Sequence, residues 1–181
     1  MKKTTIFFMS FLMAIVMCAQ TKHLKFMGIP LNGTITQFQS KLAAKGVTPI
    51  TRVNQTLPVG GRVFTGTFAG EKADIYAYYN TKTKIVYRAK AVTRYSDINR
   101  VQDKLKEYKN MLIEKYPYHE REDYEYKGRP AFAIIVHDED DNSLGCISLY
   151  ISLYDYEYSL HIDYQDEINT DLNTSKNMDD L

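Results

Sequence analysis

The chain has no tryptophan, five prolines and only two cysteines among its 181 residues. Cys18 lies in a segment that we expect to be removed, which leaves Cys146 as the only thiol and excludes an intrachain disulfide. The apolar run Ile6–Met17 is shorter than the roughly 20 residues that a membrane-spanning helix needs. Nucleophile-elbow, metalloprotease and phosphate-binding glycine motifs are also missing, so no motif indicates a hydrolase or a nucleotide site.

The N-terminal segment has the organisation of a secretory signal peptide. Two lysines precede the apolar run, and a small residue, Ala19, follows it at the expected cleavage point. We therefore predict a signal peptide over residues 1–19 and a periplasmic or secreted mature chain. Cys18 allows a lipoprotein alternative, but Met17 stands where that signal prefers a small residue, so we favour simple cleavage.

Charge is divided unevenly along the chain. Residues 20–115 carry 17 lysines and arginines against 6 acidic residues, a net charge of +11, whereas residues 116–181 carry 4 against 16, a net charge of −12. Such asymmetry can attract a partner or let the two halves attract each other, and we favour the second interpretation. The acidic half would repel phosphate, so we expect no nucleic-acid partner.

Two stretches have the apolar periodicity of amphipathic helices. In the first, Thr34 and Gln37 have the spacing of a capping box, and Gly46 is placed to end the helix. In the second, Ser96 is the expected cap and Pro117 is the stop. The apolar faces consist of Ile35, Phe38 and Leu42 in the first helix and of Ile98, Val101, Leu105, Tyr108 and Leu112 in the second.

The segments around these helices alternate apolar and polar residues and are rich in tyrosine, which is typical of strands. We predict an α+β fold in which each helix packs on the face of an antiparallel meander of about four strands. The single domain covers residues 20–165, with halves at about 23–94 and 95–165, and a flexible polar tail occupies residues 166–181. The polar segment Tyr118–Tyr126 is expected to be an edge strand.

The stretch of residues 23–33, the helix positions Phe38, Leu42 and Gly46, and the stretch Phe64–Gly70 resemble a family of small exported proteins from Gram-negative gut anaerobes. The resemblance covers most of the mature chain and implies export, but it carries no activity. The element order also resembles the β-lactamase-inhibitor-protein architecture. That similarity implies a fold only and transfers no site residue.

Alternation along two strands predicts a face of tyrosine and basic residues. If Ile75 and Ala77 face inward, the tyrosines between and beside them face outward, and the same logic applies around Leu149. Exposed tyrosine beside arginine is typical of contact surfaces, so we expect a protein or glycan partner and no cofactor. The alternative is a solvated face on which tyrosines shield lysine stems. The candidate binding residues are Tyr76, Tyr78, Arg88, Lys90, Tyr150 and Tyr154.

Two other functions stay open. His161 and Asp163 project from one strand face and could begin the zinc site of a metal-dependent hydrolase, although no sequence pattern supplies the further ligands. A half-exposed polar strand face is the simpler interpretation of this pair. Alternatively, the two halves could enclose a hydrophobic ligand between them, which an apolar pocket would reveal.

An acidic cluster has part of the spacing of a calcium-binding loop. Asp138, Asp140 and Asn142 match the first ligands of an EF-hand. The match then fails, because Ser143 replaces the required glycine and Leu149 stands where a bidentate glutamate belongs. We therefore interpret the cluster as the charged tip of a hairpin and predict no metal site.

Overall fold

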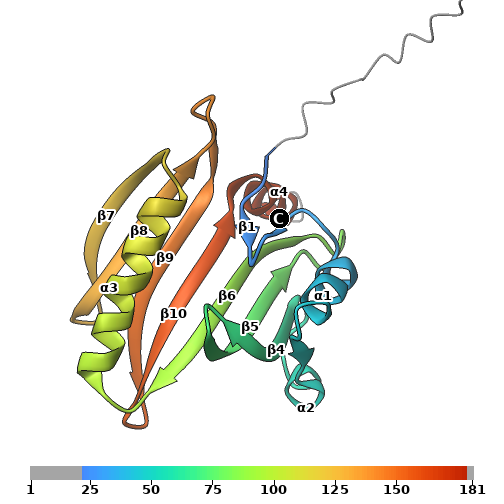
Figure 1. Ribbon diagram of the computed structural model, residues 1–181. Helices are drawn as coiled ribbons and strands as arrows, with labels where there is room; N and C mark the ends of the chain where they lie inside the picture. Colours follow the sequence, from blue (N-terminus) through green and yellow to red (C-terminus); the bar gives the residue numbers. More distant parts are fainter. Residues whose placement is uncertain (1–21, 179–181) are drawn as a thin grey trace, which may run out of the picture.

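The computed structural model describes residues 22–178, with side chains as far as Asn173. The predicted signal peptide, residues 1–19, lies outside the described residues. The described chain forms an α+β fold dominated by an antiparallel sheet, as the sequence predicts (Figure 1). None of the helices in this part of the chain is both long and apolar enough to cross a membrane.

The fold begins with a short hairpin, β1 (Lys25–Phe26) paired with β2 (Ile29–Pro30). Helix α1 (Ile35–Ala43) follows and starts at the predicted capping box. The hydroxyl of Thr34 accepts a hydrogen bond from the backbone N–H of Gln37, whose side-chain oxygen accepts one from the N–H of Thr34. Two short elements come next, β3 (Thr48–Pro49) and α2 (Thr51–Asn54).

Helix α3 (Ile98–Lys115) separates two runs of long strands. The carboxylate of Asp97 caps it by accepting hydrogen bonds from the N–H groups of Asn99 and Arg100. The predicted cap, Ser96, is therefore wrong by one residue, because the neighbouring carboxylate is better placed at the positive end of the helix dipole. The run before α3 consists of β4 (Gly61–Phe68), β5 (Glu71–Tyr79) and β6 (Val86–Tyr95).

The run after α3 ends in a helix that the sequence did not predict. Its strands are β7 (His119–Tyr126), β8 (Arg129–His137), β9 (Ser143–Tyr154) and β10 (Glu157–Asp166). The polar tail predicted for residues 166–181 is wrong over Glu167–Met178, which form α4. Asp166 is itself buried, and α4 contacts β6, β9 and β10, so tertiary contacts stabilise a helix that lacks an apolar stripe of its own.

The long strands and β3 form one eight-stranded sheet in the order β3-β4-β5-β6-β10-β9-β8-β7. The last strand in the sequence, β10, therefore lies in the middle of the sheet, between β6 and β9 (Figure 1). The β6–β10 pair extends from Tyr158 opposite Tyr95 to Gln165 opposite Arg88. The strand β7 lies at one edge, which confirms the edge prediction for the polar segment.

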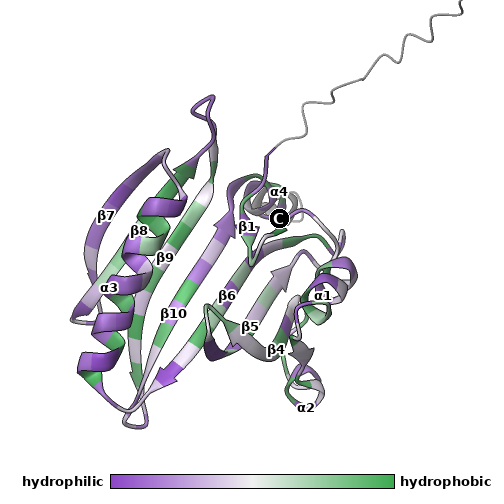
Figure 2. Cartoon of the chain, viewed as in Figure 1, coloured by the Kyte–Doolittle hydropathy of each residue, from purple (hydrophilic) through white to green (hydrophobic). Residues whose placement is uncertain are grey.

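One face of the sheet carries the core, beneath α1 and α3 (Figure 1). Apolar residues alternate with polar ones along the strands, and the apolar stripes of both helices pack on the same side (Figure 2). Phe26 lies at the centre of this layer. Its ring centroid is 6.4 Å from that of Phe38, 5.4 Å from Phe68 and 5.3 Å from Tyr164, so the N-terminal hairpin joins α1, β4 and β10.

Several ion pairs connect the basic N-terminal half of the chain to the acidic C-terminal half. Lys109 of α3 lies 2.5 Å from a carboxylate oxygen of Asp123, and Lys22 lies 2.7 Å from Glu139. Arg94 pairs across β6 and β10 with Glu157, at 3.5 Å. These contacts agree with the prediction that the two halves attract each other. Most of them are exposed to water, which screens the charges, so each adds little to the stability of the fold.

Candidate binding face

The strand positions that point away from the core form a second face, which we call the open face because α1 and α3 lie on the other side. Strand pairing aligns its central residues. Tyr76 is opposite Lys90 and Tyr78 is opposite Arg88 across β5 and β6. Asp163 of β10 is in turn opposite Lys90. Residues from three adjacent strands therefore meet at the centre of the open face.

Basic side chains lie over the tyrosine rings on this face. The guanidinium carbon of Arg88 is 5.2 Å from the ring centroid of Tyr78, and the ammonium of Lys90 is 5.2 Å from that of Tyr76. Burial raises the pKa of both phenols, and it lowers the pKa of Lys90. The four side chains are half-buried and interleaved, so they form a continuous surface instead of separate exposed groups.

Arg88 is held in place by a two-pronged ion pair. Its Nε and Nη2 atoms donate to the two carboxylate oxygens of Asp163, at 2.8 and 2.5 Å. Asp163 is only 6% exposed, so Arg88 compensates a carboxylate that would otherwise be buried without a partner. Hydrogen bonding to Asp163 raises the pKa of Arg88. Sequence alternation could not indicate this pair, because the pairing of β6 with β10 was unknown.

Tyr150 extends the same surface onto β9. Its ring stacks on His161 at 4.5 Å and 5°, and it contacts Tyr126 at 4.7 Å. Burial raises the pKa of the Tyr150 phenol, which stays neutral. Tyr154 lies four residues further along β9, is 85% exposed and is separate from this cluster. The structure thus brings together five of the six predicted residues and leaves Tyr154 at the hairpin end.

A hollow of about 320 Å³ opens between Arg88 and the tyrosines of the edge strand. Of the residues that line it, the sequence analysis predicted only Arg88 and Tyr150 as binding residues, and it missed the edge-strand tyrosines, Tyr124 and Tyr126. Alternation along β7 could have placed these two tyrosines on one face of the strand. It could not have placed them next to Arg88, because that depends on the order of the strands in the sheet. Burial raises the pKa of the Cys146 thiol in this hollow, which favours the weakly nucleophilic protonated form. The remaining lining residues are Ser148, Asp163 and Gln165.

His161 and Asp163 do not converge on one point. The Nε2 atom of His161 lies 2.7 Å from the hydroxyl of Ser152, and its buried Nδ1 has no partner among the described residues. The carboxylate of Asp163 is occupied by Arg88. A serine–histidine pair without a group that orients the imidazole lacks the third member of a nucleophilic triad. Within residues 22–173, no three His, Cys, Asp or Glu side chains are grouped closely enough to hold a metal ion.

His161 should make the stability of the fold depend on pH. Burial of the ring, and then the charge of Lys90, lower the pKa of His161 to about 4, against about 6.5 in an unfolded chain. Between these values the unfolded state binds more protons, so the unfolding free energy falls as the pH is lowered from 6.5 to 4. His161→Gln removes the group that titrates, so we expect the fall in the unfolding free energy to be about 2 kcal/mol smaller in the variant. This value allows for the partial exposure of the ring, which screens the effect. Urea denaturation of both proteins at pH 7, 5.5 and 4.5 measures it, and parallel curves would contradict the assignment.

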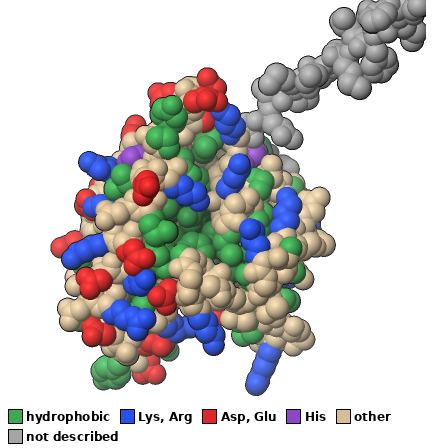
Figure 3. Space-filling model, viewed as in Figure 1, with side chains coloured by type: hydrophobic (Ala, Val, Ile, Leu, Met, Phe, Trp, Pro, Cys, Tyr) green, Lys and Arg blue, Asp and Glu red, His purple; other side chains and the backbone are tan. Residues whose placement is uncertain are grey.

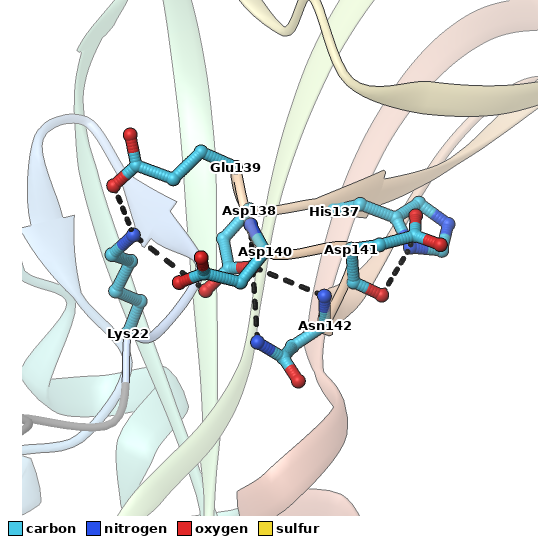
Figure 4. A network of polar contacts seen from close by, with 7 residues as sticks. All are labelled: Lys22, His137, Asp138, Glu139, Asp140, Asp141 and Asn142. Atoms are coloured by element: carbon cyan, nitrogen blue, oxygen red, sulfur yellow. Dashed lines mark hydrogen bonds and ion pairs between the residues drawn. The ribbon is translucent and has the colours of Figure 1, made fainter.

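The acidic cluster forms the tip of the β8–β9 hairpin, as predicted (Figure 4). One carboxylate oxygen of Asp138 accepts hydrogen bonds from the backbone N–H groups of Asp140 and Asn142, at 2.9 and 3.0 Å. These bonds, the one to Asn142 above all, lower the pKa of Asp138. Lys22 lies 3.6 Å from the other oxygen. The carboxylate thus closes the loop on itself, and the geometry explains the cluster without a calcium ion.

None of the protein-family models, curated proteins and solved structures with which the chain was compared matches it. The resemblance to a family of small exported proteins therefore stays a prediction.

Proposed function

We propose that this chain is an exported, non-enzymatic binding protein that contacts a protein or glycan partner with its open face. The observation that carries the proposal is the interleaved cluster of Tyr76, Tyr78, Arg88 and Lys90, which the pairing of β5, β6 and β10 holds in register. Tyr150 continues the cluster onto β9. Tyrosine and arginine supply large contact area with few rotatable bonds, which is why they dominate the energetics of many interfaces.

The cluster is organised before any partner arrives. Asp163 fixes the guanidinium of Arg88. Each cation that lies over a tyrosine ring also restricts the side-chain rotation of the tyrosine and of the basic residue. Each side chain that becomes ordered on binding costs about 0.5–1.5 kcal/mol of binding free energy, so a surface that is already ordered loses less of that free energy. Lys90 forms no ion pair within the described residues, so its ammonium, held over the Tyr76 ring, can meet a carboxylate of the partner.

The same proposal includes export and a two-unit architecture. The basic, apolar and small-residue regions of residues 1–19 support secretion to the periplasm or beyond. In the two-unit description, α1 belongs with β4–β6 and α3 with β7–β10, and both helices pack on one sheet face. The sheet order, in which two antiparallel runs meet at β6 and β10, supports this description. It leaves the opposite face free for a partner.

A variant that removes three contact groups should lose the partner. We expect Tyr76→Ser, Tyr78→Ser and Lys90→Gln together to weaken binding at least 10-fold, since truncating one interface hot spot costs about 2 kcal/mol. Arg88 is kept, because its loss would leave Asp163 buried and unpaired. The measurement is affinity capture from the native envelope with mass spectrometry, together with a glycan array, followed by titration of the captured ligand.

The matched control changes exposed residues away from the cluster. Tyr118→Ser and Tyr156→Ser remove two exposed tyrosines, and Lys106→Gln removes one exposed lysine of α3. This control should capture the same ligand with unchanged affinity. Capture of the same ligand by the open-face variant, at equal affinity, would place the interface elsewhere on the molecule.

A further inference from the structure

The helix side of the molecule contains an apolar hollow that is separate from the open face. It has a volume of about 650 Å³, within the range of small-molecule sites, and lies between the C-terminal part of α3 and the N-terminal hairpin. Figure 3 shows apolar side chains gathered at the centre of this side, with basic side chains around them and acidic ones on the side of α3. The apolar lining includes Met27, Phe68, Met111, Leu112 and Ile162.

The hollow exists because α1 and α3 cover different parts of the sheet. In Figure 1, α3 lies over β8–β10 and α1 lies beyond β4 and β5. Met27, in the turn of the β1–β2 hairpin, lines one wall of the hollow. Ile162 and Tyr164 of β10 contribute from the sheet below. A wall of methionine can adjust to a flexible chain, because the thioether side chain has three rotatable bonds.

Basic residues without acidic partners lie at the mouth of the hollow. Lys45, just after α1, and Lys115, at the end of α3, both line it, and neither forms an ion pair with the described residues. Burial and then the charge of Lys25 lower the pKa of Lys115, which places a second lysine close to it. Glu114 is the one carboxylate that lines the hollow. The excess of positive charge favours an anion at the mouth.

We propose that this hollow binds a single-chain anionic amphiphile. The acyl chain lies among Met27, Met111 and Leu112, and the acidic head group meets Lys45 and Lys115. A carboxylate and a phosphate share the chemistry that the lysines recognise, so a fatty acid and a lysophospholipid are both suitable. The site does not depend on the proposed function of the open face, since the two surfaces lie on opposite sides of the sheet.

The test uses the protein after it has been recovered from the envelope of expressing cells and its bound lipid has been removed. Palmitate should bind it saturably, with a dissociation constant in the micromolar range, and monopalmitin, which is neutral, should bind at least 5-fold more weakly. Calorimetric titration with palmitate, lysophosphatidate and monopalmitin distinguishes the two acidic head groups from each other and from a neutral one. The proposal would be overturned if neither palmitate nor lysophosphatidate bound saturably, or if monopalmitin bound as tightly as they do.

Variants test the contacts of the acyl chain and those of the head group separately. Met111 is half exposed, so Met111→Glu should fold normally while it places a charge in the hollow and weakens palmitate binding at least 10-fold. Lys45→Gln with Lys115→Gln should weaken palmitate binding about 5- to 10-fold and leave monopalmitin unchanged. The control is Lys41→Gln with Lys106→Gln, two exposed lysines outside the hollow. Equal palmitate affinity in wild type and Met111→Glu, with both folded by thermal unfolding, would exclude this hollow.

Discussion

Asp166→Ala is expected to lower the unfolding free energy by about 3–5 kcal/mol, because it removes a fully buried carboxylate on which two distant parts of the chain converge. Both oxygens of Asp166 lie 3.1 Å from Nδ1 of His23. The backbone N–H groups of Leu24 and Asn169 donate to the same carboxylate, each at 3.0 Å. Alanine would leave these buried donors without an acceptor, and each such group costs about 1–3 kcal/mol.

Asp166→Asn is the informative companion of the alanine variant. Leu24 and Asn169 donate to different oxygens of the carboxylate. The amide keeps one acceptor oxygen and turns the other into a donor that faces one of these two N–H groups, so we expect an intermediate loss of about 2 kcal/mol. Asp140→Ala, in the exposed hairpin tip, serves as the control and should change stability by about 0.5 kcal/mol or less. Urea denaturation followed by circular dichroism measures all three. A loss below 1 kcal/mol in the alanine variant would show that the carboxylate is not a structural centre.

Gly145→Ala is expected to cost more than about 3 kcal/mol or to prevent folding, because the added methyl group has no space. A Cβ atom at this position would lie 2.1 Å from the carbonyl oxygen of Gln165 and 3.1 Å from the Cα atom of Asp166. Both belong to the backbone of the neighbouring strand β10. Gly145 also has a φ of +139°, which side chains rarely adopt.

The matched control is Gly70→Ala, at the turn between β4 and β5. Its φ is +84°, but no heavy atom lies within 4 Å of the added Cβ position. Only the backbone penalty applies, and we expect about 1 kcal/mol. Soluble yield and urea denaturation compare the two variants. If Gly145→Ala and Gly70→Ala lose the same amount, the close approach of β9 and β10 at Gly145 is not what requires glycine.

The local structure of both predicted helices could be derived from the sequence, because caps and apolar spacing act within a few residues. The capping box at Thr34 and the stop after Tyr116 appear as predicted. Strand alternation likewise placed Tyr76 and Tyr78 on the face opposite the core. These signals depend on neighbours in the chain, so no knowledge of the tertiary fold is needed to interpret them.

Features that join distant segments could not be derived in the same way. The contact of Asp163 with Arg88 depends on the pairing of β6 with β10, which no local pattern specifies. Helix α4 was missed because its polar sequence lacks periodicity and its contacts come from β6, β9 and β10. The apolar hollow depends on the separation between α1 and α3 and on the position of Met27, neither of which alternation indicates.

The central place of β10 also restricts the order in which the protein can be assembled. Synthesis proceeds from the N-terminus, so the ribosome completes β6 about sixty residues before its neighbour Glu157–Asp166. Until then the inner edge of β6 has free hydrogen-bonding groups, which makes the unfinished chain prone to wrong pairing. A nascent chain that cannot close its sheet early stays unfolded for longer, and this delay would suit the export that we propose, in which the polypeptide passes a membrane before it folds.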